Sequence, residues 1–231
     1  TMLLLAPVLG LLPHATLAAV VIVYSVGLIQ PAEFAAIRKV RMMEFRWALI
    51  ACIGVLIFGT LKGILVAIIV SLIGLASQEA RPQLYVIGRK RGADVLRPLS
   101  PEHPDDETFP GLLIVRPEGR IFFFNAQLLA EGVSALVDEH KPCVLVIDMS
   151  RVPDLEYSAL QMLMEGVQRA ADRGVTVWLA ALNPAVLQVV RNAGFDGQLG
   201  EDRLLFNARE AIARYQAMQA SAGGVPPPAK A

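Results

Sequence analysis

Hydrophobic residues are concentrated at the start of the chain. Residues 2–29 form an apolar run without Asp, Glu, Lys or Arg. Because proline ends or bends a helix, this run predicts one helix that ends before Pro13 and a second over residues 15–29. A later apolar run, residues 47–77, has Lys62 as its only charged residue. Both runs predict helices that cross a membrane.

The later apolar run is too long for one straight span. Its 31 residues would extend roughly 46 Å as a helix, against a hydrocarbon core of about 30 Å. Basic residues flank it at 38–46 and 81–91, and the positive-inside tendency places both flanks in the cytoplasm. Two cytoplasmic ends require an even number of crossings, so we expect a hairpin that turns at residues 59–63.

Small residues recur at four-residue spacing in this hairpin. Gly59 lies at the predicted turn, and Gly63, Ala67 and Ser71 share one face of the helix that follows. Such a pattern lets membrane helices pack closely, so we interpret the face as a packing surface. The alternative is that Gly and Ala are simply common in membrane helices. The spans contain no carboxylate or arginine pair typical of an ion path, so residues that hold a transported solute are expected outside this chain.

Beyond residue 81 the apolar residues fall into short runs separated by Gly, Pro and charged residues. Runs bounded by turn signals predict strands, and helical spacing of apolar residues predicts helices. Their alternation indicates an α/β domain, and residues 98–110 are expected to be a loop. The expected strands are 84–87, 111–115, 121–124, 143–147 and 175–179, and the expected helices are 125–140, 159–173, 184–192 and 208–218.

The sequence also predicts three local features of this domain. Strands 111–115 and 121–124 are expected to form a hairpin, and Asn125 to cap the helix that follows. The phenylalanines at 122–124 are interpreted as core and strand face rather than as an aromatic binding platform. The apolar strand 143–147 is expected to be covered on both faces.

Composition and charge limit the classes of function. The chain is 55% hydrophobic and 18% charged, which places part of it in lipid. Residues 81–231 are nearly neutral, so they offer no footprint for nucleic acid. The two cysteines and three histidines have neither disulfide nor metal-ligand spacing, so no metal site is assigned. The apolar start lacks a basic leader segment, so it is not interpreted as a signal peptide. We expect the chain to be the C-terminal piece of a longer protein.

The domain organisation follows from these patterns. Residues 1–80 are expected to be the last transmembrane helices of an incomplete membrane domain. Residues 81–220 form the α/β domain, and residues 221–231, rich in Gly and Pro, a disordered tail.

Polar residues cluster where strand 143–147 leads into the next helix, at an edge where α/β domains bind ligands. Asp148 and Asp154 resemble a carboxylate pair for acid–base work or Mg²⁺ binding. No nucleophile or second polar cluster accompanies them, so loop solvation and capping are favoured and no catalytic residue is assigned. Gly-rich phosphate-binding motifs are absent from the sequence, so no nucleotide cofactor is expected. The candidate residues of this loop are Asp148, Ser150, Asp154, Glu156 and Ser158.

Ser158 has two interpretations. The favoured one is a helix N-cap, whose side-chain oxygen accepts a backbone hydrogen bond and contributes about 1 kcal/mol. The alternative is a phosphoacceptor. The helix dipole would favour a phosphate at this position, whereas the carboxylates of Glu156 and Asp154 would repel it.

Five segments follow one another along the chain: Leu12-Pro13 leading into 18–23, the Gly59/Gly63 hairpin, Arg81-Pro82 before a strand, 110–116 and 121–126. Together and in this order they resemble the C-terminal end of sulfate permease (SulP) family anion transporters. The resemblance implies a multi-helix membrane domain followed by a cytoplasmic STAS domain, a mixed β-sheet with helices. It also implies secondary transport of sulfate, bicarbonate or dicarboxylates, with the anion site in earlier helices. No residue constellation supports a hydrolytic or transferase activity, so no enzymatic activity is expected.

STAS domains are shared with bacterial anti-sigma factor antagonists, whose loop reads roughly Asp-x-Ser-x-Val-x-x-x-Asp-Ser-Ser-Gly-Leu. In this resemblance Ser158 lies at the phosphorylated position. This sequence departs from the pattern at Glu156, Tyr157 and Ala159. The residues that match are Asp148, Ser150, Val152 and Leu160.

Two functional hypotheses follow. The first is a secondary anion transporter of the cell (inner) membrane, multi-pass, with a cytoplasmic regulatory STAS domain. The second is a membrane-tethered STAS signalling module that acts through partner binding and Ser158 phosphorylation. The expected partners are the upstream membrane helices of the same protein, the lipid bilayer, an inorganic anion held by residues outside this chain, a second copy in a homodimer and a regulatory protein at the STAS domain. No nucleic acid and no cofactor are expected.

Overall fold

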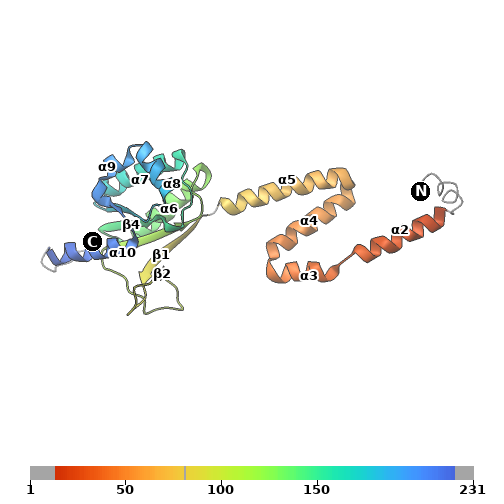
Figure 1. Cartoon of the computed structure of the whole chain (residues 1–231), viewed down its shortest axis with the longest axis horizontal. Helices are drawn as coiled ribbons and strands as arrows, with labels where there is room; N and C mark the ends of the chain where they lie inside the picture. Colours follow the sequence, from red (N-terminus) through yellow and green to blue (C-terminus); the bar gives the residue numbers. More distant parts are fainter. Residues whose placement is uncertain (1–13, 81, 222–231) are drawn as a thin grey trace. The chain divides into compact units, whose positions relative to one another are not determined.

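The computed structural model describes residues 14–80 and 82–221 (Figure 1). The helix expected before Pro13 and residues 222–231 of the expected tail lie outside the described residues. Ser221, which the sequence analysis assigned to the tail, is instead the last residue of a helix. The chain divides into two compact units, Thr1–Leu75 and Ala76–Ala231, which are described separately.

The described part of the first unit is helical. Two stretches, Ala15–Val40 and Thr60–Ser77, are long and apolar enough to cross a membrane. Large apolar side chains such as Leu56 and Leu61 are exposed by 80% and 86%, which requires lipid or further helices to cover them. The segment 33–46, expected to be polar, is helical apart from a break at Arg41. The helices are α2 (His14–Leu28), α3 (Pro31–Val40), α4 (Met42–Phe58) and α5 (Thr60–Glu79).

The predicted turn in the long apolar run is confirmed. Helix α4 ends at Phe58, and Gly59 has a φ of +78°, a conformation that glycine adopts without steric cost. On α5, a Cβ at Gly63 would lie 2.7 Å from the backbone nitrogen of Val55. A Cβ at Gly74 would overlap the indole ring of Trp47 in the same way. The two helices therefore pack backbone against backbone at Gly63, and the backbone of α5 packs against the Trp47 side chain at Gly74.

The second unit contains a six-stranded mixed sheet in the order β2-β1-β3-β4-β5-β6. β1 is antiparallel to β2 and β3, whereas β3, β4, β5 and β6 are parallel. The mixed sheet confirms the expected fold class. The strands are β1 (Gln83–Arg89), β2 (Leu96–Pro98), β3 (Leu112–Glu118), β4 (Val144–Asp148), β5 (Thr176–Ala180) and β6 (Leu204–Leu205).

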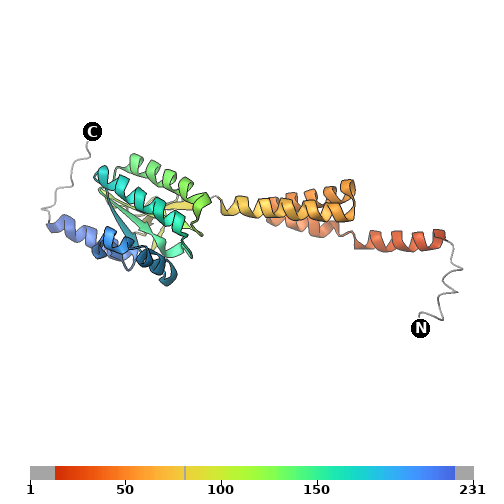
Figure 2. The same ribbon diagram turned by 90° about the horizontal axis from the view of Figure 1, so that it is seen from above.

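Helices cover both faces of this sheet. Four helices pack on one face, and α10 packs on the other (Figure 1). Figure 2 shows α6 and α7 running alongside each other. Every residue of β4 is buried, as expected for a strand covered on both faces. The helices are α6 (Phe123–His140), α7 (Tyr157–Asp172), α8 (Pro184–Asn192), α9 (Phe195–Leu199) and α10 (Ala208–Ser221).

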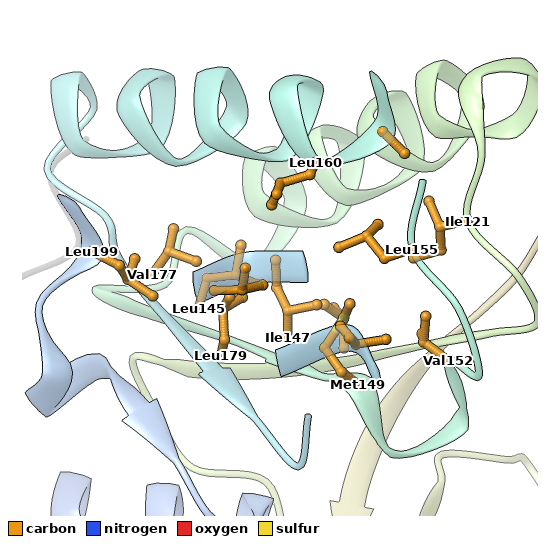
Figure 3. Packing of buried hydrophobic residues seen from close by; sticks show 14 of the residues in the cluster. Ile121, Leu145, Ile147, Met149, Val152, Leu155, Leu160, Val177, Leu179 and Leu199 are labelled. Carbon is orange, nitrogen blue, oxygen red and sulfur yellow. The ribbon is translucent and has the colours of Figure 1, made fainter. Parts of the chain in front are cut away.

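Alternate residues of the parallel strands enter two hydrophobic clusters. The larger cluster, on the side of α6 to α9, includes Ile147 and Leu179 under Leu160 (Figure 3). The smaller cluster, under α10, includes Val146 and Trp178. This alternation follows from the two-residue period of a strand.

The predicted strand at 121–124 and its hairpin are wrong. Phe122 precedes α6, which begins at Phe123, and Ile121 forms only an isolated parallel bridge with Leu155. Phe123 and Phe124 are 63% and 60% exposed, so they are not core residues either. Three consecutive aromatic residues suit a strand by propensity, but hydrogen bonds to the start of α6 outweigh this preference.

Asn125 provides some of those hydrogen bonds, although not as the predicted N-cap. It is the third residue of α6 and is 1% exposed. Its Oδ1 accepts from the Phe122 backbone N–H at 3.0 Å, and its Nδ2 donates to the Arg120 carbonyl at 2.8 Å. The side chain therefore stabilises the backbone just before the helix, as the third residue of a capping box does.

The predicted loop at 98–110 is confirmed except at Pro98, which is the last residue of β2, and the loop is held by ion pairs. The Arg97 guanidinium donates to both carboxylate oxygens of Asp106, at 2.7 and 2.8 Å. These hydrogen bonds lower the pKa of Asp106. Arg89 forms a second pair with Glu107 at 2.8 Å. The loop is thus fixed to β1 and β2 by these side chains and by an isolated β-bridge in which Arg89 and Glu107 exchange two main-chain hydrogen bonds.

Candidate functional site

The candidate site lies at the edge of the sheet where β3 and β4 end. The loop after β3 and the loop after β4 are joined by three main-chain hydrogen bonds. Gly119 N donates to Arg151 O at 3.1 Å, Ile121 N to Asp154 O at 3.1 Å, and Glu156 N to Ile121 O at 2.9 Å. The two loops therefore form one structural unit, in which Leu155 is 3% exposed and anchors the loop in the core.

A third loop joins this unit through Asn183. Its Nδ2 donates to the carbonyl of Val152 at 2.6 Å, while its Oδ1 accepts from Val186 N at 2.9 Å and so caps α8. This residue was not among the candidates predicted from the sequence. An Asn directly before a Pro at a helix start is a recognisable N-cap signal, but the link to Val152 depends on tertiary structure.

Asp148 is buried in an ion pair with Arg116. Arg116 Nε and Nη2 both donate to Asp148 Oδ2, at 2.9 and 2.7 Å. Asp148 Oδ1 accepts from Ser150 N at 3.0 Å, and the residue is 2% exposed. Both oxygens thus have protein partners, which gives Asp148 a structural role at the start of the loop. Arg116 was also missed, although an arginine within an apolar strand is a signal for a buried pair.

Asp154 and Glu156 hold the loop after β4 to the start of α6. Asp154 Oδ2 accepts from Arg120 Nε at 2.7 Å in an exposed ion pair. Glu156 Oε2 accepts from the backbone N–H of Phe123 at 3.1 Å, and Glu156 is itself the N-cap residue of α7. One residue therefore contributes to the start of both helices.

Ser158 is not the predicted N-cap. It is the second residue of α7, because the helix begins at Tyr157 with Glu156 as its N-cap. The Ser158 Oγ is buried and has no hydrogen-bond partner in the described part of the chain. A modifying enzyme would reach this oxygen only after the first turn of α7 opens. Ser150, by contrast, is exposed on the same loop.

Exposed apolar side chains border the loops. Phe123 packs edge to face with Phe122 and Phe124, at centroid distances of 6.0 and 6.1 Å. Exposed groups of this size commonly mark binding surfaces. We call this set the aromatic surface: Phe123 (63% exposed), Phe124 (60%), Leu128 (51%) and Tyr157 (64%).

Four packing positions were predicted in the membrane hairpin. In the structure one of them makes a tight contact, two line an open groove and one forms the turn. Gly63 contacts Val55 of α4. Ala67 and Ser71 face α4 across a cavity of about 630 Å³ that Cys52 also lines. Gly59 forms the turn. The small-residue face therefore points toward α4, with close packing at Gly63.

Within residues 14–80 and 82–221, no group of three or more His, Cys, Asp or Glu side chains could hold a metal ion. The five loop candidates are brought together by the fold, but Asp148 and Ser158 point into the protein, whereas Ser150 and Glu156 are exposed. The arrangement can present a binding surface and a covered hydroxyl.

Comparisons with known proteins agree with this architecture. The family model described as STAS domain matches residues 103–211. The high affinity sulfate transporter 2 of Stylosanthes hamata is 27% identical over 225 residues, 93% of this chain and 34% of the relative. Sulfate transporter 1.1 of Arabidopsis thaliana is 26% identical over 219 residues, 90% of this chain and 34% of the relative. The chain thus spans about a third of the length of these relatives.

A solved structure shares the fold. The murine Solute Carrier 26 family member A9 anion transporter, in the inward-facing state, aligns with a TM-score of 0.70 at 16% identity. The alignment covers 82% of this chain and 31% of that chain.

Proposed function

We propose that the intact protein is a secondary anion transporter, since this chain carries a STAS domain and corresponds to the C-terminal part of SulP/SLC26 transporters. The transported anion is sulfate or a related anion such as bicarbonate or a dicarboxylate. The single observation that carries the proposal is that similarity to sulfate transporters extends over 93% of the chain. It therefore includes the apolar helices as well as the α/β domain.

In this proposal the chain supports transport without holding the anion. Helices α4 and α5 contain Lys62 as the only charged residue between Arg46 and Glu79, so the anion is held by helices outside this chain. We infer a multi-pass protein of the cell (inner) membrane with the STAS domain in the cytoplasm, which the basic flanks of the hairpin support. The protein acts as a transporter rather than an enzyme and associates as a homodimer.

The STAS domain regulates transport by binding a protein at the two hydrogen-bonded loops that follow β3 and β4. The aromatic surface supports this role, because it leaves large apolar side chains in water beside the loop of Ser158. Such side chains are typical anchors of protein interfaces.

A second candidate function is a membrane-tethered signalling module. It is favoured by the position of Ser158, which matches the phosphorylated position of anti-sigma factor antagonists, and by the adjacent aromatic surface. In this case the domain binds its partner according to the phosphorylation of Ser158, and no anion crosses the membrane.

Uptake by the intact protein separates the two functions. Purified full-length protein in lipid vesicles is expected to take up labelled sulfate, bicarbonate or succinate with saturable kinetics, above the level of protein-free vesicles. A Phe123→Ala/Phe124→Ala variant, which leaves the membrane helices unchanged, is expected to retain basal uptake. Absence of uptake for all three anions by folded protein would contradict the transport proposal and favour the signalling module.

A further inference from the structure

A cavity of about 290 Å³ lies inside the α/β domain, between α6, α7 and the sheet. Its floor includes Leu145 and Val177 of the central strands, and its walls include Ala130 of α6 and Leu163 of α7. Gly166 of α7 also lines it, and a Cβ at this position would meet no atom within 4 Å. The helices are therefore separated by an apolar space that penetrates to the core.

Polar side chains surround the opening of this cavity, and most of them are paired. Arg173 Nη1 contacts Asp138 Oδ1 at 3.0 Å. Gln127 Nε2 donates to Glu131 Oε1 at 2.8 Å. Arg169 of α7 is exposed and has no hydrogen-bond or ion-pair partner in the described part of the chain. Of the charged side chains that line the cavity, Arg173 is paired with a carboxylate and Glu131 accepts from a neutral amide, so Arg169 offers the guanidinium that is free to bind an anion.

An apolar interior with one unpaired arginine at its opening suits a ligand with an aliphatic chain and a single anionic head. We propose that this cavity binds a medium-chain aliphatic carboxylate, with the chain between α6 and α7 and the carboxylate at Arg169. A planar guanidinium binds a carboxylate through two parallel hydrogen bonds. At about 30 Å³ per water-sized group, the cavity accommodates a chain on the order of ten carbons. This site is separate from the aromatic surface and does not depend on anion transport.

Photolabelling of the full chain in lipid nanodiscs tests the site. The probe is a dodecanoate analogue with a diazirine in the chain, and labelled peptides are identified by mass spectrometry. Peptides of α6 and α7 should be labelled in a saturable manner and protected by unlabelled dodecanoate. Peptides of α5, which contact lipid directly in the proposed function, report unspecific partition of the probe and should not saturate.

Two variants test the two parts of the ligand. Gly166→Leu fills the cavity and is expected to reduce labelling of α6 and α7 at least about fivefold, whereas Gly197→Leu on α9, where a Cβ also meets no atom, leaves it unchanged. Arg169→Gln is expected to raise the half-saturating dodecanoate concentration about tenfold, the order of a charge-assisted contact, but not that of dodecanol. Arg191→Gln, an exposed arginine on α8, is the matched control.

The labelling results distinguish a specific site from unspecific partition of the probe. Labelling of α6 and α7 that does not saturate, or that persists in Gly166→Leu, would mean partition of an additive only and would overturn the site. Unchanged affinity in Arg169→Gln would overturn the assignment of the anionic head. If Gly166→Leu does not fold, as judged by circular dichroism, Ser134→Leu on the opposite wall replaces it with the same expectation.

Discussion

Ser158 carries a hydroxyl that is buried and unpaired within the described residues. Ser158→Ala is therefore expected to leave the free energy of unfolding unchanged or to raise it by up to about 0.5 kcal/mol, because alanine has the higher helix propensity. Loss of an N-cap would instead cost about 1 kcal/mol. The measurement is urea unfolding of the full chain, followed by the fluorescence of Trp178 in a Trp47→Phe background.

A charged replacement extends this comparison. Ser158→Asp puts a carboxylate where the oxygen is covered, and is expected to cost roughly 1–3 kcal/mol in the same experiment. Ser150→Asp, on the exposed part of the same loop, is the matched control and should change stability by less than about 0.5 kcal/mol. Equal effects of the two replacements would show that the turn at Ser158 is already open.

The Arg116–Asp148 pair is the second residue-scale feature that sets stability. Asp148→Asn removes the charge that compensates buried Arg116, so a loss on the order of 3 kcal/mol is expected. Asp138→Asn breaks the exposed pair with Arg173 and should cost less than about 1 kcal/mol. Urea unfolding of both variants tests the difference, and similar costs would refute a special role for the buried pair.

At the residue scale, the sequence predicted which segment holds the candidate residues, but not the contacts that their side chains make. Ser150, Asp154 and Glu156 do lie on the connection between β4 and α7, with Asp148 at the end of β4 and Ser158 in the first turn of α7. The N-cap is nevertheless Glu156, because the helix starts two residues earlier than its apolar period suggests. The partners Arg116 and Asn183 come from other strands and loops, and sequence spacing carries no information about such contacts.

At the scale of elements, the contact of α4 with α5 depends on Gly63. Gly63→Ala would place a Cβ against the backbone of Val55, which cannot move aside as a side chain can. The hairpin is therefore expected to open, with a lower aggregation temperature of the full chain in detergent, measured by size-exclusion chromatography after heating. Gly54→Ala is the control, since its Cβ would have ordinary contacts at 3.7 and 3.8 Å. An equal decrease in both variants would argue against close packing at Gly63.

The start of α6 allows a test of whether its aromatic residues are surface or core. Phe123→Ala/Phe124→Ala should change the free energy of unfolding by less than about 1 kcal/mol, because both rings are exposed. Phe195→Ala, where the ring is 2% exposed, should cost about 3–5 kcal/mol. Urea unfolding compares the two, and a large loss in the double variant would assign the phenylalanines to the core after all.

Elements with a single strong pattern could be predicted. The apolar run at 143–147 is a buried central strand, and Gly59 ends α4 as the glycine signal indicated. The run at 121–124 was misassigned because local propensity competes with two distant determinants, the amide of Asn125 and the carboxylate of Glu156. Both supply hydrogen bonds that only the helical start can use.

At the scale of the whole molecule, the two units differ in whether their apolar side chains are buried within the chain. The α/β domain buries its own core on both faces of the sheet. The described helices of the first unit expose most of their large apolar side chains. This contrast agrees with a sequence that separates long apolar runs from short, alternating ones, and it explains why the fold class could be predicted from the lengths of those runs.

The position of Glu156 has one further consequence. Its carboxylate accepts from the Phe123 amide while its backbone begins α7, so the first turns of the two helices that enclose the cavity are joined by one side chain. A change of conformation at the start of α7 would remove this partner from the Phe123 amide, whose hydrogen would then exchange faster. The rate at which that single amide exchanges its hydrogen for deuterium is thus a direct readout of the state of the loop, independent of any ligand or transported ion.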